Sequence, residues 1–529
     1  MAGLDGLLQE SEVEMKRFID CLFKIVFGRT LIIILMVLLQ ILVLLGSFIE
    51  LRTFYPYIWE SMNVLGALLI IFIINRDEPA EFKLSWIIPI CLFPVLGALI
   101  YVFIMGNFGG IGLKAKLGRR IKETEGMLFS DDNTNEAIAG CPASFQGFAF
   151  YMENNAGFPA YHNSGAVYYP LGEDKFADLL LELEKAQKYI FLEYFIIERG
   201  KMWNAVLDIL KEKVKEGVEV RVMYDGMCSI MLLPYKYPQE LQQYGIKAKM
   251  FAPIVPFLST TQNNRDHRKI AVIDGKVAFT GGVNLADEYI NEVERFGHWK
   301  DVSVKITGDA VRSFTVMYLQ MWNVSEKGEE NYRKYLKDIV FETPLFHDGY
   351  VIPYGETPTR SAEVGKTVYE SMINGAARYV HIMTPYFIVD REFLDSMRYA
   401  ARRGVEVSMI LPHIPDKKVV YYIARTFYPE LLKAGIRVYE YLPGFVHAKV
   451  FVSDDMCATV GTINLDYRSF YHHFECGVYL YDNSEIAKIE KDFQDTLLKC
   501  REVTFDYYKK IPLYQKAVGR VSRLMAPLL

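Results

Sequence analysis

The chain has 529 residues, which is enough for two or three domains. Charged residues make up 23% of it and the formal net charge is −5, so the composition does not favour a nucleic-acid-binding protein, which carries an excess of basic residues. The seven cysteines are scattered and form no CxxC pair, which argues against a disulfide framework or a zinc site and indicates a reducing compartment.

Apolar residues are concentrated in the first 105 positions. Residues 30–49 contain no charged side chain and are long enough to cross a bilayer core. Residues 86–105 form a second such run, whose two prolines are tolerable in a membrane helix. A weaker run covers residues 57–74. We therefore predict a membrane anchor of two or three transmembrane helices over residues 29–107, preceded by a charged segment, residues 1–28, of unassigned role.

Basic residues flank this anchor on both sides. The positive-inside rule would place both flanks in the cytoplasm, which requires an even number of spans, whereas three spans would place them on opposite faces. The topology therefore stays open, and the predicted location is the cell membrane, as a multi-pass protein. The basic residues are Lys16, Arg17, Lys24 and Arg29 before the anchor, and Lys114, Lys116, Arg119, Arg120 and Lys122 after it.

Regular alternation of helices and strands begins after residue 165. Residues 108–165 are predicted to be a linker, because 131–165 are rich in Asn, Gly, Ala and Pro. The alternation that follows indicates βαβ units and a parallel or mixed sheet. In this first half we expect helices at 176–187, 203–216 and 238–244, and strands at 189–197, 218–224 and 246–251.

The second half repeats this order of elements. The predicted fold is therefore α/β, with two α-β-α domains related by a pseudo-two-fold axis, at residues 166–325 and 351–529, joined by a connector at 326–350. In the second half we expect helices at 364–377 and 393–403, a short helix ending at Gly435, and strands at 379–388, 405–411 and 436–442.

One stretch of sequence occurs twice in the same register. Residues 267–285 read HRKIAVIDGKVAFTGGVNL, and residues 447–465 read HAKVFVSDDMCATVGTINL. Each copy has a Lys two residues after its His, an Asp seven residues after it and an Asn seventeen residues after it. Such an internal repeat is not accidental. Its candidate catalytic residues are His267, Lys269 and Asp274 in the first copy, and His447, Lys449 and Asp454 in the second.

The His and Lys of each copy suit chemistry on a phosphodiester. Each His is expected to begin a strand, whose alternation places His267 and Lys269 on the same face. The lysine can neutralise phosphate oxygens while the imidazole attacks phosphorus or transfers a proton. A single such His would be interpreted as a buried histidine with its hydrogen bonds satisfied inside the protein, and a single Lys as a solvent-exposed charge. Because both recur at a fixed register, we favour a catalytic site.

The other polar positions of the repeat receive different interpretations. Asp274 is followed by Gly275 between two apolar runs, which is a strong hairpin signal, so we interpret Asp274 and Asp454 as fixing the turn rather than reacting. Asn284 and Asn464 follow Gly-rich turns and are expected to donate hydrogen bonds to phosphate oxygens.

Two incomplete sites predict one complete site at the pseudo-two-fold interface, and nothing in the sequence demands a metal or another cofactor. Each His should have a carboxylate that orients it. Glu475 is the candidate for His447. Asp301 is the candidate for His267, with Glu294 a weaker choice. The alternative for these carboxylates is an ordinary surface charge.

The paired HxKx4D motifs resemble the signature of the phospholipase D superfamily, and the chain is similar to bacterial cardiolipin synthases over nearly all residues from Arg29 onward. Residues 1–29 are longer and more charged than this resemblance requires. The stretches that carry the narrower resemblance are residues 75–79 with 83–86 in the anchor, 162–165, 282–285 and the terminal residues 525–529.

The resemblance implies a mechanism without a cofactor. One imidazole, here His267, attacks phosphatidylglycerol and forms a phosphatidyl-histidine. The other, here His447, protonates the departing glycerol and then deprotonates a hydroxyl of a second phosphatidylglycerol, which yields cardiolipin. The implied partners are phosphatidylglycerol and membrane lipids, not nucleic acid; the oligomeric state is not predicted.

Three other functions are compatible with the motifs. They are a hydrolytic phospholipase D or phosphatidylserine-type synthase, a membrane-tethered nuclease, and a binding protein with an inactive site. The acidic net charge argues against the nuclease. The intact His, Lys and Asn of both copies argue against an inactive site.

Overall fold

A computed structural model shows that the chain forms two compact units. The first contains Met1–Gly110, Gly226–Tyr237 and Ala252–Gln262, and the second contains the rest. The structure describes residues 56–105, 110–228, 232–253, 263–326, 328, 330–337, 339, 348–358 and 363–528, together with the isolated positions 38, 42 and 46.

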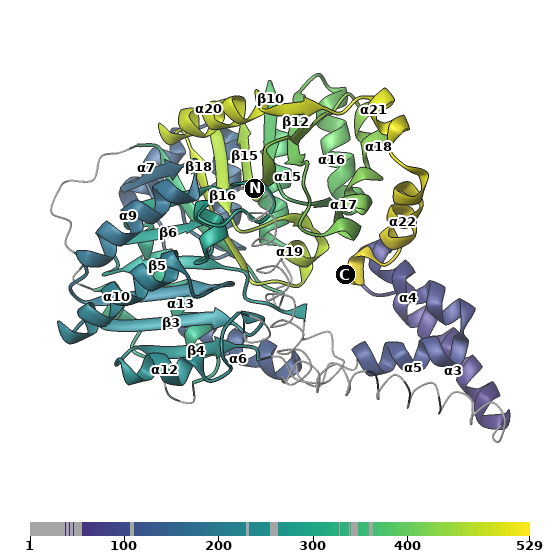
Figure 1. The fold of residues 1–529 in the computed structure, drawn as a ribbon, viewed down its shortest axis with the longest axis horizontal. Helices are drawn as coiled ribbons and strands as arrows, with labels where there is room; N and C mark the ends of the chain where they lie inside the picture. The colour runs from purple at the N-terminus through teal and green to yellow at the C-terminus, as the bar shows by residue number, and fades with distance from the viewer. Residues whose placement is uncertain are drawn as a thin grey trace, which may run out of the picture. The chain divides into compact units, whose positions relative to one another are not determined.

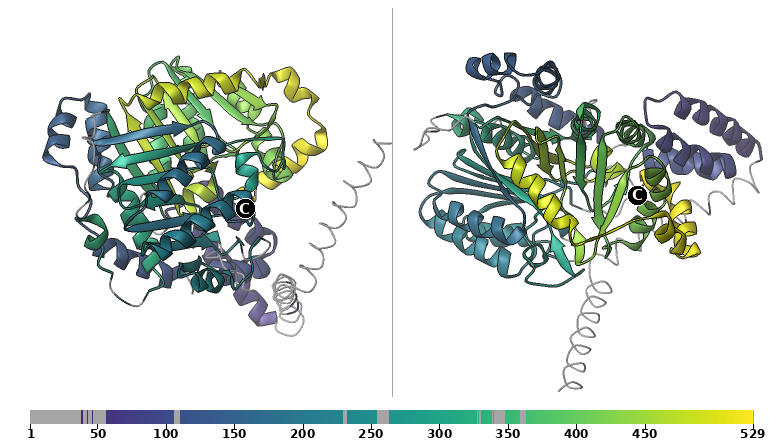
Figure 2. Two further views of the ribbon diagram at one scale, coloured as in Figure 1. Left: turned by 60° about the vertical axis from the view of Figure 1, so that its left-hand side comes forward. Right: turned by 90° about the horizontal axis from the view of Figure 1, so that it is seen from above.

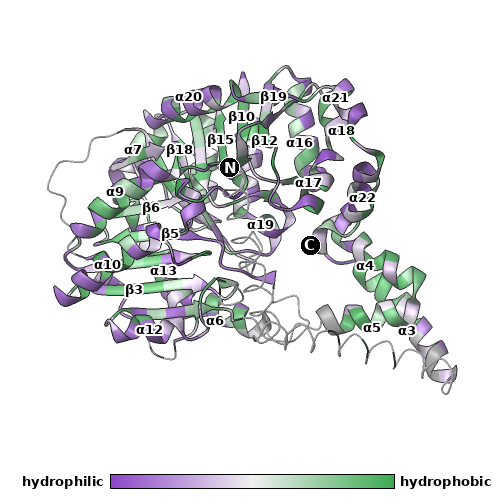
Figure 3. Ribbon diagram, viewed as in Figure 1, coloured by the Kyte–Doolittle hydropathy of each residue, from purple (hydrophilic) through white to green (hydrophobic). Residues whose placement is uncertain are grey.

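Three apolar helices pack together in the first unit: α3 (Pro56–Ile74), α4 (Ala80–Leu92) and α5 (Pro94–Met105). Figure 3 draws α4 and α5 largely in the hydrophobic colour. Gly97 lets α5 approach α4 closely, since a Cβ there would lie 2.7 Å from the Cα of Ile90. The rings of Trp86 and Tyr101 pack edge to face, with centroids 5.3 Å apart.

The prediction of one continuous helix over residues 86–105 is wrong, whereas the membrane location of this run stays a prediction. Two helices share this run: α4 ends at Leu92 and α5 begins at Pro94, because a proline disfavours helical geometry at the residue before it. Phe93 accordingly has φ −136° and ψ 75°. With 13 and 12 residues, the two helices are about 20 Å long or less, against a bilayer core of about 30 Å.

No helix in the described ranges is both long and apolar enough to cross a membrane. The weaker run at 57–74 corresponds to α3. The predicted span at 30–49 and the charged segment at 1–28 lie outside the described residues, apart from the helical positions Leu38, Leu42 and Gly46.

The second unit contains two mixed sheets with the same topology. Read from opposite edges, their strand orders are β1-β8-β6-β5-β2-β3-β4 and β9-β18-β16-β15-β10-β12-β13, with β19 as an extra edge strand. Equivalent neighbours pair in the same sense: β2 with β3 and β10 with β12 are parallel, whereas β2 with β5 and β10 with β15 are antiparallel. The predicted α/β repeat with mixed sheets is therefore confirmed.

The strands of the first sheet are β1 (Ser164–Tyr169), β2 (Tyr189–Tyr194), β3 (Glu219–Asp225), β4 (Lys247–Phe251), β5 (Lys269–Ile273), β6 (Val277–Gly281) and β8 (Ser303–Gly308). Those of the second sheet are β9 (Tyr350–Glu356), β10 (Tyr379–Met383), β12 (Glu406–Pro412), β13 (Arg437–Tyr441), β15 (Val450–Ser453), β16 (Cys457–Gly461), β18 (Glu475–Tyr481) and β19 (Cys500–Glu502).

Helices join the two sheets into one body (Figures 1 and 2). α9 (Gly172–Glu184) and α10 (Lys201–Lys215) pack on the first sheet, and α15 (Val364–Gly375) and α16 (Arg391–Arg402) pack on the second. By contrast, α13 (Val311–Asn323) and α20 (Glu485–Leu497) each contact strands of both sheets. Strand β6 also touches β16 and β18, so the two halves share a core. The domain boundaries predicted above stay a prediction.

The stretch 131–165, which we expected to be irregular, contains α7 (Asp132–Ala139) and α8 (Ala143–Asn154). The side chain of Asp131 caps α7 by accepting a hydrogen bond from the Thr134 amide at 2.7 Å. α8 buries Phe145, whose ring stacks on Tyr481 with centroids 3.8 Å apart. These helices were not predicted, because the stretch is rich in Asn, Gly and Ala and its apolar stripe is short.

Two short pairings complete the unit. β7 (His298–Lys300) pairs with β14 (Gly444–Val446), and β11 (Phe387–Ile388) pairs with β17 (Leu465–Asp466), so the predicted strand 379–388 is interrupted after β10. Within the described residues, the remaining helices are α6 (Gly110–Glu123), α12 (Tyr237–Gln243), η2 (Asp287–Ile290), α14 (Arg333–Leu336), α17 (Lys418–Arg425), α18 (Tyr428–Lys433), α19 (Tyr467–Tyr471), α21 (Phe505–Lys510), α22 (Leu513–Arg523) and η3 (Ala526–Leu528).

Candidate active site

The pairing of β7 with β14 brings His447 to the first half of the chain. Its parallel register places Lys300 opposite Val446, so the next residues, Asp301 and His447, also lie side by side. The backbone N–H of His447 donates to the Lys300 carbonyl at 2.7 Å, and its Nδ1 lies 2.6 Å from Asp301 Oδ2. His447 precedes β15 by three residues and His267 precedes β5 by two, so neither histidine begins a strand as predicted.

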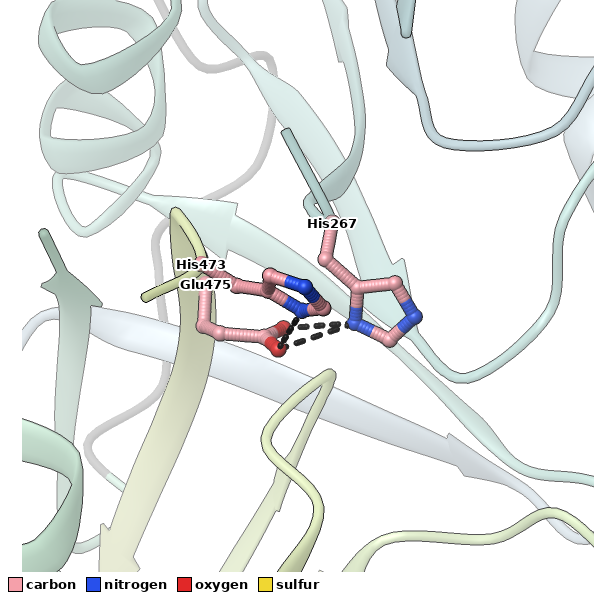
Figure 4. A group of neighbouring side chains, drawn as sticks. All are labelled: His267, His473 and Glu475. Atoms are coloured by element: carbon pink, nitrogen blue, oxygen red, sulfur yellow. Dashed lines mark hydrogen bonds and ion pairs between the residues drawn. The ribbon is translucent and has the colours of Figure 1, made fainter. Parts of the chain in front are cut away.

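His267 is held in the same way by the second half of the chain. A parallel bridge joins Asp266 to Phe474, and the His267 N–H donates to the Phe474 carbonyl at 2.9 Å. Nδ1 of His267 then lies 2.9 and 2.8 Å from the two carboxylate oxygens of Glu475 (Figure 4).

The predicted assignment of carboxylates was therefore wrong. Glu475 bonds to His267, not to His447, and Asp301 bonds to His447, not to His267. Each imidazole is oriented by the carboxylate of the other half, because backbone pairing crosses between the halves just before each acid. Glu294 is exposed.

Both carboxylates are fully buried and fixed in place. Glu475 also accepts hydrogen bonds from Ser469 Oγ at 2.7 Å and from Thr462 Oγ1 at 2.5 Å. Asp301 accepts the Val302 N–H at 2.8 Å and packs against Gly282, where a Cβ would lie 1.9 Å from Oδ1. Glycine is therefore required at position 282 to leave room for the carboxylate.

The two lysines of the repeat are almost completely buried beside their histidines. Lys269 Nζ donates to the His267 carbonyl at 2.7 Å, and Lys449 Nζ donates to the His447 carbonyl. Burial lowers the pKa of Lys269 to about 8 and that of Lys449 to about 7, against the attraction of Asp301 and Glu475. A bound phosphate anion would stabilise both charged amines.

Both imidazoles are neutral in the free site. Burial, followed by the charges of Lys269 and Lys449, lowers the pKa of His267 well below its usual value. Burial and Lys449 lower the pKa of His447 to about 4, although the charge and hydrogen bond of Asp301 raise it. Because Nδ1 of each ring is directed at a carboxylate, Nε2 is left with the reactive lone pair. The lysines of both halves act on His267, so the two copies form one electrostatic site.

Aromatic rings surround the two imidazoles. The Phe195 ring lies 4.8 Å from His267, and the rings of Tyr289, Trp299 and Phe445 lie 5.5, 5.5 and 5.7 Å from His447. Sequence reasoning did not identify these residues, because isolated aromatic positions are more often part of a core. Here they exclude water from a site that holds two histidines, two lysines and two carboxylates.

A third imidazole, His473, also escaped sequence analysis. Its ring lies 5.4 Å from that of His267, and its Nδ1 is 3.5 Å from Glu475 Oε1 (Figure 4). Its position two residues before the carboxylate, equivalent to Trp299 in the first half, was the available signal. His267, His473 and Glu475 are the described residues that could hold a metal ion, with ligand atoms within 4.8 Å of one another. The Glu475 oxygens already accept hydrogen bonds from Ser469, Thr462 and His267.

Asp274 and Asp454 lie at the opposite ends of their strands from the histidines. Asp274 accepts the amides of residues 187–189 at 2.7–2.8 Å, and Asp454 accepts those of residues 377–379 at 2.6–2.8 Å. Both have positive φ, 54° and 57°, as expected in a tight turn. These contacts support the interpretation that both residues fix the turn, and they also hold the segments that enter β2 and β10.

The two asparagines of the repeat differ. Asn284 Oδ1 accepts the Ile196 amide at 2.9 Å and its Nδ2 donates to the Tyr289 hydroxyl at 2.7 Å, so most of its hydrogen-bonding capacity is used within the protein. Asn464 is buried, and its Oδ1 has no hydrogen-bond partner in the part of the chain that the structure describes. Phosphate binding by either residue stays a prediction.

Two halves with equivalent sheets and a shared His–Lys site define the phospholipase D-like class of proteins. A solved phosphatidylserine synthase from Haemophilus influenzae has a similar fold, with a TM-score of 0.55 and 18% identity over 72% of this chain and 97% of that chain. Residues 179–296 and 369–497 match the family model "Cardiolipin synthase, PLD-like domain", and residues 64–104 match "Phospholipase_D-nuclease N-terminal".

Curated relatives narrow this class to a family. A cardiolipin synthase from Alkalihalophilus pseudofirmus is 34% identical over 89% of this chain and 93% of its own length. One from Geobacillus thermodenitrificans is 35% identical over 89% and 93%. A protein from Streptococcus mutans described as uncharacterized is 46% identical over 87% of this chain and 99% of its own. The chain belongs to the cardiolipin synthase family.

Proposed function

We propose that the chain is a cardiolipin synthase that converts two phosphatidylglycerol molecules into cardiolipin and glycerol. The observation that carries the proposal is the pair of buried His–Lys sets joined by the hydrogen bonds His267–Glu475 and His447–Asp301. One phosphodiester is exchanged for another, so the reaction needs no input of energy from a nucleotide.

In the first step, Nε2 of His267 attacks phosphorus and the bond from phosphorus to the glycerol oxygen breaks. His447, which takes up a proton at Nε2 when the phosphodiester anion binds and raises its pKa, gives this proton to that oxygen, and glycerol leaves. A neutral nucleophile is required, and the lowered pKa of His267 provides it. Glu475 stabilises the positive charge that develops on the ring, and Lys269 and Lys449 stabilise the charge on the phosphate oxygens.

In the second step, His447 accepts a proton from a glycerol hydroxyl of another phosphatidylglycerol. That oxygen attacks phosphorus, the bond between nitrogen and phosphorus breaks, and cardiolipin forms. Asp301 supports the assignment of His447 as the acid, because the charge and hydrogen bond of Asp301 raise the pKa of His447. A bound phosphodiester anion raises it further. The rings of Tyr289, Trp299 and Phe445 around His447 favour a lipid hydroxyl over water as the acceptor.

The site acts at the cell membrane, in which residues 29–107 are the proposed anchor. The apolar run 30–49 supports this proposal, as do the many exposed apolar side chains on α3, α4 and α5, including Leu68, Leu92 and Val102. Because α4 and α5 are short and pack together, we propose that they form a hairpin embedded in one leaflet, in place of the second span predicted from the sequence.

Purified full-length protein should make cardiolipin from vesicles in which phosphatidylglycerol is the only lipid. The expected result is release of one glycerol per cardiolipin, with no other cosubstrate, measured by thin-layer chromatography and an enzymatic glycerol assay. Phosphatidic acid as the main product would instead indicate hydrolysis. Cleavage of DNA without any lipid turnover would contradict the proposal.

A further inference from the structure

The C-terminal helix α22 (Leu513–Arg523) has its apolar face directed away from the rest of the second unit. At 3.6 residues per turn, the apolar positions of the segment 513–524 fall within one arc of about 140°. Large side chains in this arc are exposed: Leu513 by 81%, Val521 by 68% and Leu524 by 55%. A surface helix of a soluble protein normally shows the opposite arrangement.

The polar face of α22 packs on the protein instead. Gly519 is buried against α17, where a Cβ would lie 2.4 Å from the Tyr422 carbonyl oxygen. Gln515 accepts a hydrogen bond from Arg425 at 3.2 Å, and the Arg523 guanidinium lies 3.7 Å from the centre of the Phe427 ring. These contacts fix the rotation of the helix about its axis, so its exposed apolar face is built into the fold.

The segment that contains this face is rich in basic residues. After Asp506 the sequence contains no Asp or Glu up to Leu529, although the whole chain has a net charge of −5. Arg520 lies at the border of the apolar arc and is exposed. The basic residues of this terminal segment are Lys509, Lys510, Lys516, Arg520 and Arg523.

From this geometry we propose that α22 is an in-plane membrane helix, which inserts its apolar face among the acyl chains of an anionic bilayer. Apolar side chains bordered by Lys and Arg are the pattern of interfacial helices, and the basic residues complement anionic headgroups. If it stayed in water, a contiguous apolar surface of this kind would promote association of the protein with other proteins or with itself. The inference rests on the proposed function only for the choice of phosphatidylglycerol as the anionic lipid.

The helix would give the second α/β half its own contact with the lipid surface, separate from residues 29–107. Because α22 is fixed to α17 through Gly519 and to Phe427 through Arg523, insertion would orient the folded unit and not merely tether it. The catalytic imidazoles lie in the same compact unit as α22. Membrane contact through this helix therefore restricts how the site meets its lipid substrates.

The test places a genetically encoded fluorescent amino acid at position 521 of the full-length chain, with the His267→Ala substitution to keep the lipid composition constant. The protein is reconstituted into phosphatidylglycerol–phosphatidylcholine vesicles with or without a lipid carrying a doxyl quencher on its acyl chain. A probe at position 208 on α10, where the Asp208 side chain is 74% exposed, serves as the reference.

We expect the doxyl lipid to reduce the emission at position 521 at least twofold more than at position 208, and less strongly in vesicles of phosphatidylcholine alone. Leu513→Glu with Leu524→Glu should reduce this quenching to the reference value. Leu498→Glu, at another highly exposed leucine outside α22, should leave it unchanged. None of these readouts depends on catalysis.

Two results would overturn the proposal. Emission that the doxyl lipid does not change, but that is also shielded from aqueous iodide, would mean that another protein surface covers the helix. Emission that iodide quenches and the doxyl lipid does not would mean that the helix stays in water.

Discussion

Replacement of His267 or of His447 by alanine should each abolish cardiolipin formation, by roughly 10⁴-fold or more in kcat. The reason is that neither histidine has a substitute: one forms the bond to phosphorus and the other transfers the proton, and groups that act as a unit fail together. Initial rates with phosphatidylglycerol vesicles measure this loss. The double variant should be no slower than either single variant.

His381 provides a matched control for these variants. It is also a buried imidazole bonded to a carboxylate, with Nδ1 2.9 Å from Glu490, but it lies within β10 and outside the candidate site. His381→Asn should therefore retain turnover within about tenfold of the parent, as expected for a packing residue. Substantial activity in either His267→Ala or His447→Ala would contradict a single shared site.

Asp301→Asn and Glu475→Gln should each reduce turnover by roughly 10²- to 10⁴-fold, the range expected when the carboxylate that orients a catalytic imidazole is neutralised. Each side chain keeps its size but loses the charge that stabilises the imidazolium. Glu294→Gln changes an exposed carboxylate of the same segment and should have no effect.

The pH dependence separates the two carboxylate variants. Asp301 raises the pKa of His447, so its neutralisation lowers that pKa further below about 4. A residue that must be protonated to act is protonated over a lower pH range when its pKa falls. The fall of kcat at high pH, where His447 has lost the proton that it must donate, should therefore occur at a lower pH in Asp301→Asn. In Glu475→Gln it should occur at the same pH as in the parent. A shift in Glu475→Gln but not in Asp301→Asn would mean that each histidine pairs with the carboxylate of its own half. That result would contradict the hydrogen bonds.

Much of the fold could be predicted because it is encoded locally. The duplicated stretch marks the repeat, and the 3.6- and 2-residue periodicities predict α10, β3, α15 and β12 to within about two residues. Gly217 and Gly404 end equivalent helices in the two halves, both with positive φ. The helices of 131–165 were missed because their apolar stripe is only three or four residues long.

The cross-pairing of the acids could not be predicted in this way. Asp301 and His267 are close in sequence, and so are Glu475 and His447, which makes the local pairing the simpler hypothesis. The actual partners follow from β7 pairing with β14 and from the bridge between Asp266 and Phe474. Both contacts join segments separated by more than 140 residues, and such contacts leave no local pattern. The break between α4 and α5 was misread for a related reason, because Pro94 is compatible with both a kinked and an interrupted helix.

The orientation of α22 shows a further limit of sequence patterns. Its amphipathic character can be read from the sequence, but periodicity does not tell which face is buried. The contact of Gly519 with α17 shows that the polar face is the buried one.

The central claim is that the two halves form one site in which His267 carries the phosphatidyl group and His447 transfers the proton. The most direct test incubates the full-length His447→Ala variant with phosphatidylglycerol, stops the reaction at alkaline pH, where a phosphoramidate persists, and maps the adduct by mass spectrometry. Without His447 both steps are slow, but an adduct that forms during a long incubation has no base to activate the acceptor hydroxyl, so a phosphatidyl adduct should be found on His267. Absence of an adduct in this variant, together with unlabelled His447 in the His267→Ala variant, would contradict covalent transfer through this site.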